Sequence, residues 1–257
     1  MRNGYASDLF GDDDSPVGTD SPVALPPVTF PTWTKRRYAR PTYFSRVPRG
    51  TNIATAVYGA SLMGQKLYPQ GEEIAALLNA RTAAGRRLYE QVLLLMARRS
   101  SKTLATWADL IGDCATVPRR RVYTTAQDGT RAREILRDEI MELLHLAKFE
   151  QRGHGRLLIA NGSERIEFAN GSLLRAVPPK PAIFRSKPGD RIFLDEAGEY
   201  DEGLGSALLA AALPLFDTRP DPQIIISGTP GGLDENGQPK LARAGLLWDK
   251  YQEGISA

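Results

Sequence analysis

A lysine and a threonine, Lys102 and Thr103, follow a short loop that comes directly after the apolar run QVLLLMA. In the standard phosphate-binding pattern, G-x-x-x-x-G-K-[ST], backbone N–H groups close on phosphate, the lysine reaches the β- and γ-phosphates, and the hydroxyl binds Mg²⁺. The aligned residues here are Met96-Ala97-Arg98-Arg99-Ser100-Ser101-Lys102-Thr103. Because both glycine positions are substituted, an ordinary loop followed by a basic helix start explains this segment about as well as a phosphate-binding loop does.

Two carboxylates, Asp195 and Glu196, end a second apolar run, Ile192-Phe193-Leu194, further along the chain. In this arrangement the first carboxylate can hold Mg²⁺ and the second can polarise an attacking water. The alternative is a surface turn after a strand, since Asp-Glu pairs are common. The presence of both segments in this order favours phosphate chemistry over coincidence.

A third segment, Ser227-Gly228-Thr229-Pro230, follows the apolar run QIII. A hydroxyl at the tip of a strand can sense the γ-phosphate or its attacking water, and the Gly-Thr-Pro turn gives that hydroxyl a fixed backbone. Taken alone, the segment is an ordinary turn.

The elements around these segments alternate between strand and helix, which predicts a parallel sheet. Strands are expected at 91–97, 121–125, 191–194 and 223–227, and helices at 103–115 and 130–148, with a further helix at 71–87 broken near Gly85. The loop after the first strand opens a helix, whose first-turn N–H groups and dipole favour an anion. Since ligands of open α/β sheets bind beyond the carboxyl ends of the strands, the polar residues there should face a nucleotide.

Between the second helix and the Asp-Glu pair the alternation stops, and two Asn-Gly pairs appear, Asn161-Gly162 and Asn170-Gly171. Each lies between runs rich in β-forming residues, and Asn-Gly tolerates the positive φ angles of a tight turn. This part of the sequence predicts a three-stranded antiparallel meander.

Composition narrows the class of protein. The single cysteine, Cys114, excludes an internal disulfide, and with only two histidines a zinc site would need mostly carboxylate ligands. No apolar run reaches the roughly 20 residues that span a bilayer, and the start of the chain has no apolar signal core, so we expect a cytoplasmic protein without a membrane contact.

The N-terminal part differs from the rest. Residues 1–50 hold many of the prolines and few periodic apolar positions, so we expect an extended or disordered arm followed by one domain over 51–257. Basic and aromatic residues alternate between Lys35 and Arg49, and Arg119-Arg120-Arg121 form a second basic group. Such residues can track a phosphate backbone, although a solvated arm is the simpler interpretation.

Three segments together resemble the large subunit of tailed-bacteriophage terminases, the motors that package DNA: LLLMARRSSKT, IEFANGSLLRAVPPKPAIFRSKPGDRIFLDEAGEY and IIISGTPGG. They look like the Walker A, hairpin-to-Walker B and coupling segments of that family, and the resemblance covers about residues 60–257. It implies an α/β P-loop NTPase fold of the RecA-like (ASCE) type, with a mainly parallel central sheet flanked by helices plus an antiparallel β-meander.

The resemblance also implies how ATP and Mg²⁺ are bound. Lys102 and Thr103 become the phosphate and Mg²⁺ residues, within a nucleotide-binding loop that includes Arg99, Ser100 and Ser101. In this family the loop is poor in glycine and carries an arginine four residues before the lysine, here Arg98, which is thought to contact the γ-phosphate or to switch during the power stroke. Gln70, in Tyr68-Pro69-Gln70, matches the glutamine that reads adenine.

For the remaining segments the resemblance makes Asp195 the second metal anchor, Glu196 the general base and Thr229 the coupling residue. It implies double-stranded DNA, a terminase small subunit and the procapsid portal as partners, and a homo-oligomeric ring of about five copies. Two departures stand out. Ser101 replaces the glycine before the lysine, and the chain ends before the nuclease domain that follows in this family, so no DNA cleavage is expected from it.

Two other functions remain open. The substituted loop is also compatible with a slow or degenerate nucleotide-dependent DNA-binding clamp or regulator. A helicase-like translocase is disfavoured because no second motor domain follows. Phosphate release measured with and without DNA separates the motor from the clamp.

Overall fold

The computed structural model describes residues 45–256 except 161, 187–188, 202, 215–218 and 232–244. Most of the predicted N-terminal arm, including the basic and aromatic segment up to Phe44, therefore lies outside the described residues. Within 45–50, Val47 packs against the core and the carbonyl of Arg46 accepts a 2.7 Å hydrogen bond from the hydroxyl of Tyr89. The start of the described chain is thus held against the domain.

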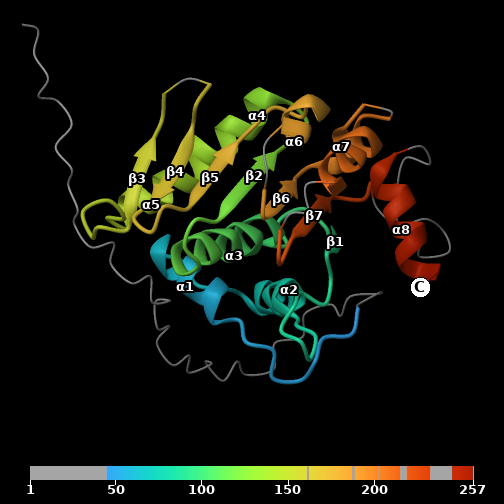
Figure 1. Ribbon diagram of the computed structural model, residues 1–257, viewed down its shortest axis with the longest axis horizontal. Helices are drawn as coiled ribbons and strands as arrows, with labels where there is room; N and C mark the ends of the chain where they lie inside the picture. The colour runs from blue at the N-terminus through green and yellow to red at the C-terminus, as the bar shows by residue number, and fades with distance from the viewer. Residues whose placement is uncertain are drawn as a thin grey trace, which may run out of the picture.

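The described residues form a seven-stranded sheet in the order β1-β7-β6-β2-β5-β4-β3 (Figure 1). Five of these strands, in the spatial order β1-β7-β6-β2-β5, pair in parallel, whereas the pairs β5-β4 and β4-β3 are antiparallel. The strands are β1 (Gln91–Leu95), β2 (Arg121–Thr125), β3 (Gly155–Leu158), β4 (Arg165–Phe168), β5 (Leu173–Ala176), β6 (Arg191–Leu194) and β7 (Gln223–Gly228). The prediction of a mainly parallel sheet with an antiparallel meander is confirmed.

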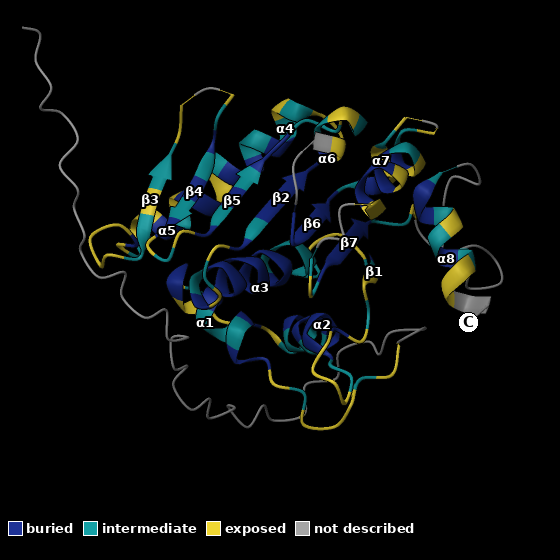
Figure 2. Cartoon of the chain, viewed as in Figure 1, coloured by how far each residue is buried: buried dark blue, intermediate teal, exposed yellow. Residues whose placement is uncertain are grey.

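Helices cover the parallel part of the sheet from both sides, and each side has its own hydrophobic cluster. The first cluster lies under α1 (Ala54–Leu62), α2 (Pro69–Asn79), α3 (Lys102–Thr116) and the helical segment α4 (Gly129–Glu134), η1 (Ile135–Met141) and α5 (Glu142–Leu146). The second lies under α6 (Pro181–Ser186), the 3-10 turn η2 (Ala197–Glu199), α7 (Leu204–Ala212) and α8 (Leu246–Ser256). Every residue of β6 and β7 is buried, as expected for strands covered on both faces (Figure 2).

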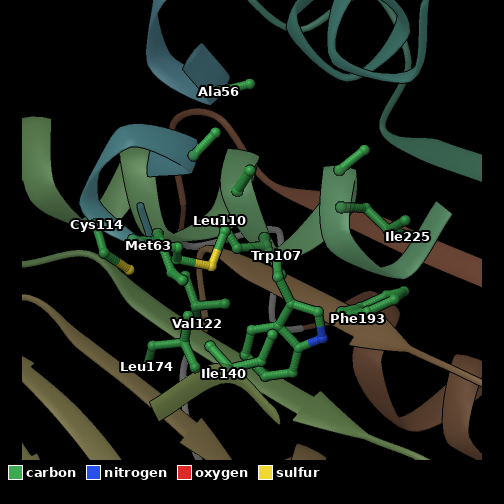
Figure 3. Close-up of a cluster of buried hydrophobic side chains, with 14 of the residues drawn as sticks. Ala56, Met63, Trp107, Leu110, Cys114, Val122, Ile140, Leu174, Phe193 and Ile225 are labelled. Carbon is green, nitrogen blue, oxygen red and sulfur yellow. The ribbon is translucent and has the colours of Figure 1, made fainter. Parts of the chain in front are cut away.

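The core beneath α3 is built around Trp107, which is 1% exposed and meets Phe193 of β6 edge to face at a centroid distance of 6.2 Å (Figure 3). Helix α1 crosses α3 at Gly59 and Gly112. A Cβ at either glycine would lie within 2 Å of a backbone oxygen of the other helix, so only glycine permits this approach. Helix α3, which starts at the predicted phosphate-binding lysine, is therefore fixed between α1 and the sheet.

Two helix predictions need correction. The helix predicted over 71–87 ends at Asn79, and Arg81 and Arg87 then form an isolated β-bridge across a turn in which Gly85 has φ +78°. The periodicity of apolar residues in the sequence continues past the end of the helix. The backbone there is nevertheless not helical, because Gly85 is left-handed and Arg81 pairs with Arg87. The helix predicted over 130–148 is helical to Leu146 but contains the π-helical segment η1.

The predicted meander is confirmed as β3, β4 and β5, although its turns are looser than Asn-Gly suggested. Gly171 has φ +78°, whereas Asn170 is not left-handed; its side chain instead accepts a 3.0 Å hydrogen bond from the amide of Ser172. The β3–β4 connection spans residues 159–164, and Asn161 lies outside the described residues. In the part of the chain that the structure describes, none of the helices has the length and apolar character needed to cross a membrane.

Candidate functional site

The loop between β1 and α3 adopts its turn without glycine. Arg99 and Ser101 both have left-handed backbones, with φ values of +63° and +61°, and Ser101 is the residue from which α3 begins. A left-handed conformation costs a residue with a Cβ roughly 1–2 kcal/mol. Of the two substituted glycine positions, Ser101 therefore keeps a strained left-handed backbone, whereas the amide of Met96 continues the strand pairing by donating to the carbonyl of Gly228 at 3.2 Å.

Lys102 connects the first and third predicted segments. Its Nζ donates a 2.9 Å hydrogen bond to Oγ1 of Thr229, which lies just beyond β7. Burial lowers the pKa of this half-buried lysine and nearby Arg98 adds to the effect, whereas the carboxylates of Asp195 and Glu196 oppose it. The structure thus brings Lys102, Asp195, Glu196 and Thr229 to one place at the carboxyl ends of the strands.

Asp195 is the most buried carboxylate of this group, at 4% exposure. Its Oδ1 accepts hydrogen bonds from the hydroxyl of Ser227 and, at 2.9 Å, from the amide of Glu196. Burial raises the pKa of Asp195, and these hydrogen bonds together with the charges of Lys102 and Arg131 only partly offset that rise. A buried carboxylate stabilised mainly by neutral donors is suited to gaining a cation.

Glu196 is more exposed than Asp195 and has a left-handed backbone, with φ +52°. One of its carboxylate oxygens, Oε1, lies 3.4 Å from Nε and 3.5 Å from Nη2 of Arg131. Arg131 belongs to the first turn of α4, where the side chain of Asp128 caps the helix by accepting from the amides of Thr130 and Arg131.

Arg131 was not among the predicted site residues, although a signal for it was present. The strand at 121–125 and the helix after it were both predicted. In a parallel sheet the start of that helix must lie at the same edge as the Asp-Glu pair.

Three buried hydroxyls toward this edge lack a hydrogen-bond partner among the described residues: Oγ of Ser100, Oγ1 of Thr124 in β2 and the phenolic oxygen of Tyr200. Burial, together with nearby Asp195 and Glu196, raises the pKa of Tyr200 far above its usual range, so it remains a neutral donor. Buried polar atoms are nearly always satisfied in folded proteins. A phosphate oxygen at the loop and a hydrated cation at Asp195 would satisfy such donors, so the residues present fit a bound nucleotide with Mg²⁺.

The remaining predicted residues lie around this centre. Thr103 is the second residue of α3, and Arg98 and Arg99 are exposed on the loop. Gln70 lies in the first turn of α2, next to Gly71, where a Cβ would lie 3.3 Å from the Cβ of Ala105 in α3. The start of α2 is therefore placed beside the first turn of α3, which is compatible with the predicted contact between Gln70 and a base.

The C-terminal helix α8 packs on the same edge. A Cβ at Gly228 would come within 2.3 Å of the Leu247 side chain, and one at Gly198 would lie 3.0 Å from it. Leu247 therefore fills the space left by the glycine in the Ser227-Gly228-Thr229 segment, which ties α8 mechanically to the strand tip that carries Thr229.

Comparisons with known proteins bear on the fold. No protein-family model and no curated protein matches the sequence. Among solved structures, the HK97 bacteriophage large terminase is similar over 80% of this chain and 42% of that one, with a TM-score of 0.63 and 15% identity. The chain has the fold of a large terminase. The large terminase ATPase domain of Thermus phage P74-26 is also similar, with a TM-score of 0.49, 19% identity and 68% and 69% coverage of the two chains.

The predicted resemblance to phage large terminases is thus confirmed at the level of the fold. The chain spans less than half the length of the HK97 terminase. On this terminase fold, the three segments that carried the resemblance meet at one edge of the sheet, and the contact between Lys102 and Thr229 joins two of them.

Proposed function

We propose that this chain is the ATP-hydrolysing motor domain of a terminase-type machine that moves double-stranded DNA into a procapsid. The observation that carries the proposal is the hydrogen bond from Lys102 to Thr229 beside Asp195 and Glu196. A lysine, a metal-binding carboxylate, a second carboxylate and a strand-tip hydroxyl are the parts that phosphoryl transfer from ATP to water requires.

Binding of ATP is assigned to the loop and the start of α3. Lys102 and the backbone amides around Ser100 and Ser101 bind the phosphates, with Arg99 beside them. Thr103 and Asp195 would hold Mg²⁺, which supplies charge neutralisation to the phosphates when bound. Gln70 is proposed to read the adenine base, because the start of α2 packs beside α3.

Glu196 is proposed to accept the proton of the attacking water. Its carboxylate is held by Arg131 at 3.4 Å, so it must exchange this partner for water before hydrolysis. The ion pair is about one-third exposed on each side, which makes it weak enough to open.

Coupling is proposed to run through Thr229. The state of the γ-phosphate changes what Lys102 and Thr229 can bind, and Gly228 next to Thr229 is packed against Leu247 of α8. A shift of the strand tip would therefore move α8. Arg98, on the loop close to Lys102, is placed to follow the same change.

The partners of this motor are proposed to be double-stranded DNA, a small terminase subunit and a portal. The chain would work in the host cytoplasm as a ring of about five copies, since head-to-tail contacts between identical subunits form a closed ring where the rotation between them closes. A slow nucleotide-dependent clamp is the second candidate, favoured by the strained Ser101 and by Met96 at the first glycine position.

Steady-state phosphate release by the purified chain, with and without duplex DNA, tests the proposal. A motor turns over ATP continuously and faster with DNA, and Lys102→Ala should abolish both binding and turnover because the lysine contacts phosphate in ground and transition states. A clamp would bind nucleotide and DNA but release phosphate at the rate of the Lys102→Ala protein. That second result would replace the motor with the clamp.

A further inference from the structure

The antiparallel half of the sheet has one face that the described helices leave largely uncovered. Residues alternate along β4 and β5, so that Ile166 and Leu174 are 0% exposed and contact the cluster under α4–α5, while their neighbours point to the opposite side. Figure 2 shows buried and intermediate residues alternating along β4 and β5 and mostly intermediate residues along β3, whereas β6 and β7 are buried throughout. We name this side the arginine face, after the four arginines that it carries, Arg121, Arg156, Arg165 and Arg175.

Strand register places these arginines in two neighbouring rows. Arg165 of β4 lies directly opposite Arg175 of β5, which in turn is paired with Tyr123 of β2. The other row runs across the same face from Arg156 through Glu167 and Leu173 to Arg121. One arginine therefore comes from each of the strands β2, β5, β4 and β3.

This arrangement carries more positive charge than the fold requires. Like charges directly opposite each other in an antiparallel pair destabilise a sheet, as Arg165 and Arg175 are. Glu167 is the one carboxylate in these two rows, and it bonds Arg165 at 2.8 Å. The Nε of Arg175 has no hydrogen-bond partner among the described residues. Because that Nε is buried, what the face offers an anionic partner is its uncompensated positive charge.

The dimensions fit a polyanion. Adjacent strands lie about 4.8 Å apart, so the four strands span about 14 Å. Duplex DNA carries one charge per ~1.7 Å of axis, which gives about eight phosphates over that length. The phosphate charge along this length therefore exceeds the charge of the four arginines, and arginine binds phosphate through a two-point fork.

We propose that the arginine face binds the phosphate backbone of the double-stranded DNA that the motor moves. The proposal rests on the function proposed above and adds the surface that function needs. The face is separate from the loop and carboxylates of the candidate site. It shares Arg121 with the predicted basic group Arg119-Arg120-Arg121, but Arg120 of that group is instead buried in ion pairs with Asp113 and Asp221.

The test compares two charge-matched double variants of the full chain. Arg165→Gln with Arg175→Gln removes the opposed pair, and Arg137→Gln with Arg86→Gln removes one partly exposed and one exposed arginine elsewhere. Binding of a short fluorescent duplex is titrated at several salt concentrations. We expect the first variant to lose affinity about tenfold or more and to reduce the slope of log K against log salt by about one per arginine, while the control keeps both.

ATP turnover measured without DNA distinguishes failure of the proposed DNA-binding surface from failure of the proposed motor function. The Arg165/Arg175 variant should keep the wild-type basal rate and thermal stability and lose only the stimulation by DNA. If wild type turns over ATP and binds duplex, but both variants bind it equally, the surface assignment is wrong and the motor proposal stands. If the wild-type chain neither turns over ATP nor binds duplex, the proposed function itself fails. A change in self-association by sedimentation, with duplex binding unchanged, would show that a second copy covers this face and would overturn the proposal.

Discussion

At the amino ends of the strands, buried arginines and aspartates pair with one another, whereas at the carboxyl ends the buried carboxylate of Asp195 is hydrogen-bonded by the neutral groups of Ser227 and Glu196. At the amino edge, Arg191 is 0% exposed and bonds Asp109 and Gln223, each at 2.6 Å. The network also includes Arg87, Arg120, Asp113, Asp190 and Asp221.

The two edges also differ in their pKa values. Burial alone would raise the pKa of Asp113, but Arg191, Arg87 and Arg120 outweigh burial and hold it below the ordinary value. At Asp195 burial prevails and the pKa is raised. At the amino edge the buried charges are matched by opposite charges within the protein, through ion pairs such as those of Asp113 with Arg120 and Arg191, although several of these atoms make no hydrogen bond among the described residues. At the carboxyl edge the buried acid Asp195 has no comparable partner in the described part of the chain, and the backbone is strained at Ser101 and Glu196.

The difference in charge pairing between the two edges gives a way to distinguish a structural cluster of charges from a functional one. Removing one partner of a buried ion pair leaves an uncompensated charge and destabilises strongly. Removing a charge that the fold does not compensate should cost little stability, and can increase it, while the ligand loses its partner. The same kind of substitution should therefore have opposite effects at the two edges.

The largest effect on stability is expected from Asp109→Asn. Its carboxylate accepts from Arg191 at 2.6 Å and from Asn79 at 2.5 Å with no solvent exposure, so the neutral amide leaves the Arg191 charge short of a partner. We expect the free energy of unfolding in a denaturant titration to fall by about 3–5 kcal/mol. Asp138→Asn, at an exposed ion pair, is the control and should leave the midpoint unchanged. A loss no larger than the control's would mean that the network does not hold this edge together.

Glu196→Gln should have the next largest effect, and on turnover instead of stability. The amide keeps the volume and the hydrogen-bonding reach but cannot accept a proton, so single-turnover hydrolysis should fall about 100-fold or more while nucleotide still binds. Fluorescent-analogue titration beside quenched single-turnover measurement checks both. Glu199→Gln, exposed in the same segment, is the matched control. Unimpaired hydrolysis in Glu196→Gln would remove it from the role of general base.

A smaller effect is expected from Arg131→Ala, which frees the Glu196 carboxylate. An ion pair that is about one-third exposed is worth at most about 1 kcal/mol, so the hydrolysis rate without DNA should rise by no more than about fivefold. Arg133→Ala, on the same helix but paired with Glu164, should leave the rate unchanged. A loss of activity greater than tenfold would mean that Arg131 contacts the substrate itself and does not merely hold the base.

The sequence was sufficient to predict that Lys102, Asp195 and Thr229 meet at the carboxyl edge, because the signal for each of them is local. Lys102, Asp195 and Thr229 each follow an apolar run, and a parallel sheet brings the ends of such runs together. The strands at 121–125 and 191–194 were predicted to the residue for the same reason.

The amino-edge network could not be predicted in this way. Asp109 looked like a helical residue, and Arg191 like the first residue of a strand, and only the packing of α3 on β6 makes them partners. The pairing of Arg131 with Glu196 and the opposed Arg165 and Arg175 likewise depend on register between distant segments.

The effect of Asp195→Asn on the free energy of unfolding should depend on pH, and this dependence distinguishes the carboxyl edge from the amino edge. Because its folded-state pKa lies above the unfolded value, ionised Asp195 lowers native stability at neutral pH, and that effect disappears below the unfolded value near 3.8. Replacing it by asparagine should therefore raise the free energy of unfolding at pH 7 by about 0.5–2 kcal/mol, with a smaller gain as pH falls toward 4.

The most direct test of the account is denaturant unfolding of wild type and Asp195→Asn at pH 7, each with and without ATP and Mg²⁺. A ligand that binds only the native state stabilises it in proportion to the logarithm of its concentration over Kd. We predict that the variant is the more stable protein without ligand, and that ATP with Mg²⁺ stabilises wild type but has little effect on the variant. A variant less stable than wild type without ligand, together with no stabilisation of wild type by ATP and Mg²⁺, would show that Asp195 is a structural residue and that this edge is not a nucleotide site.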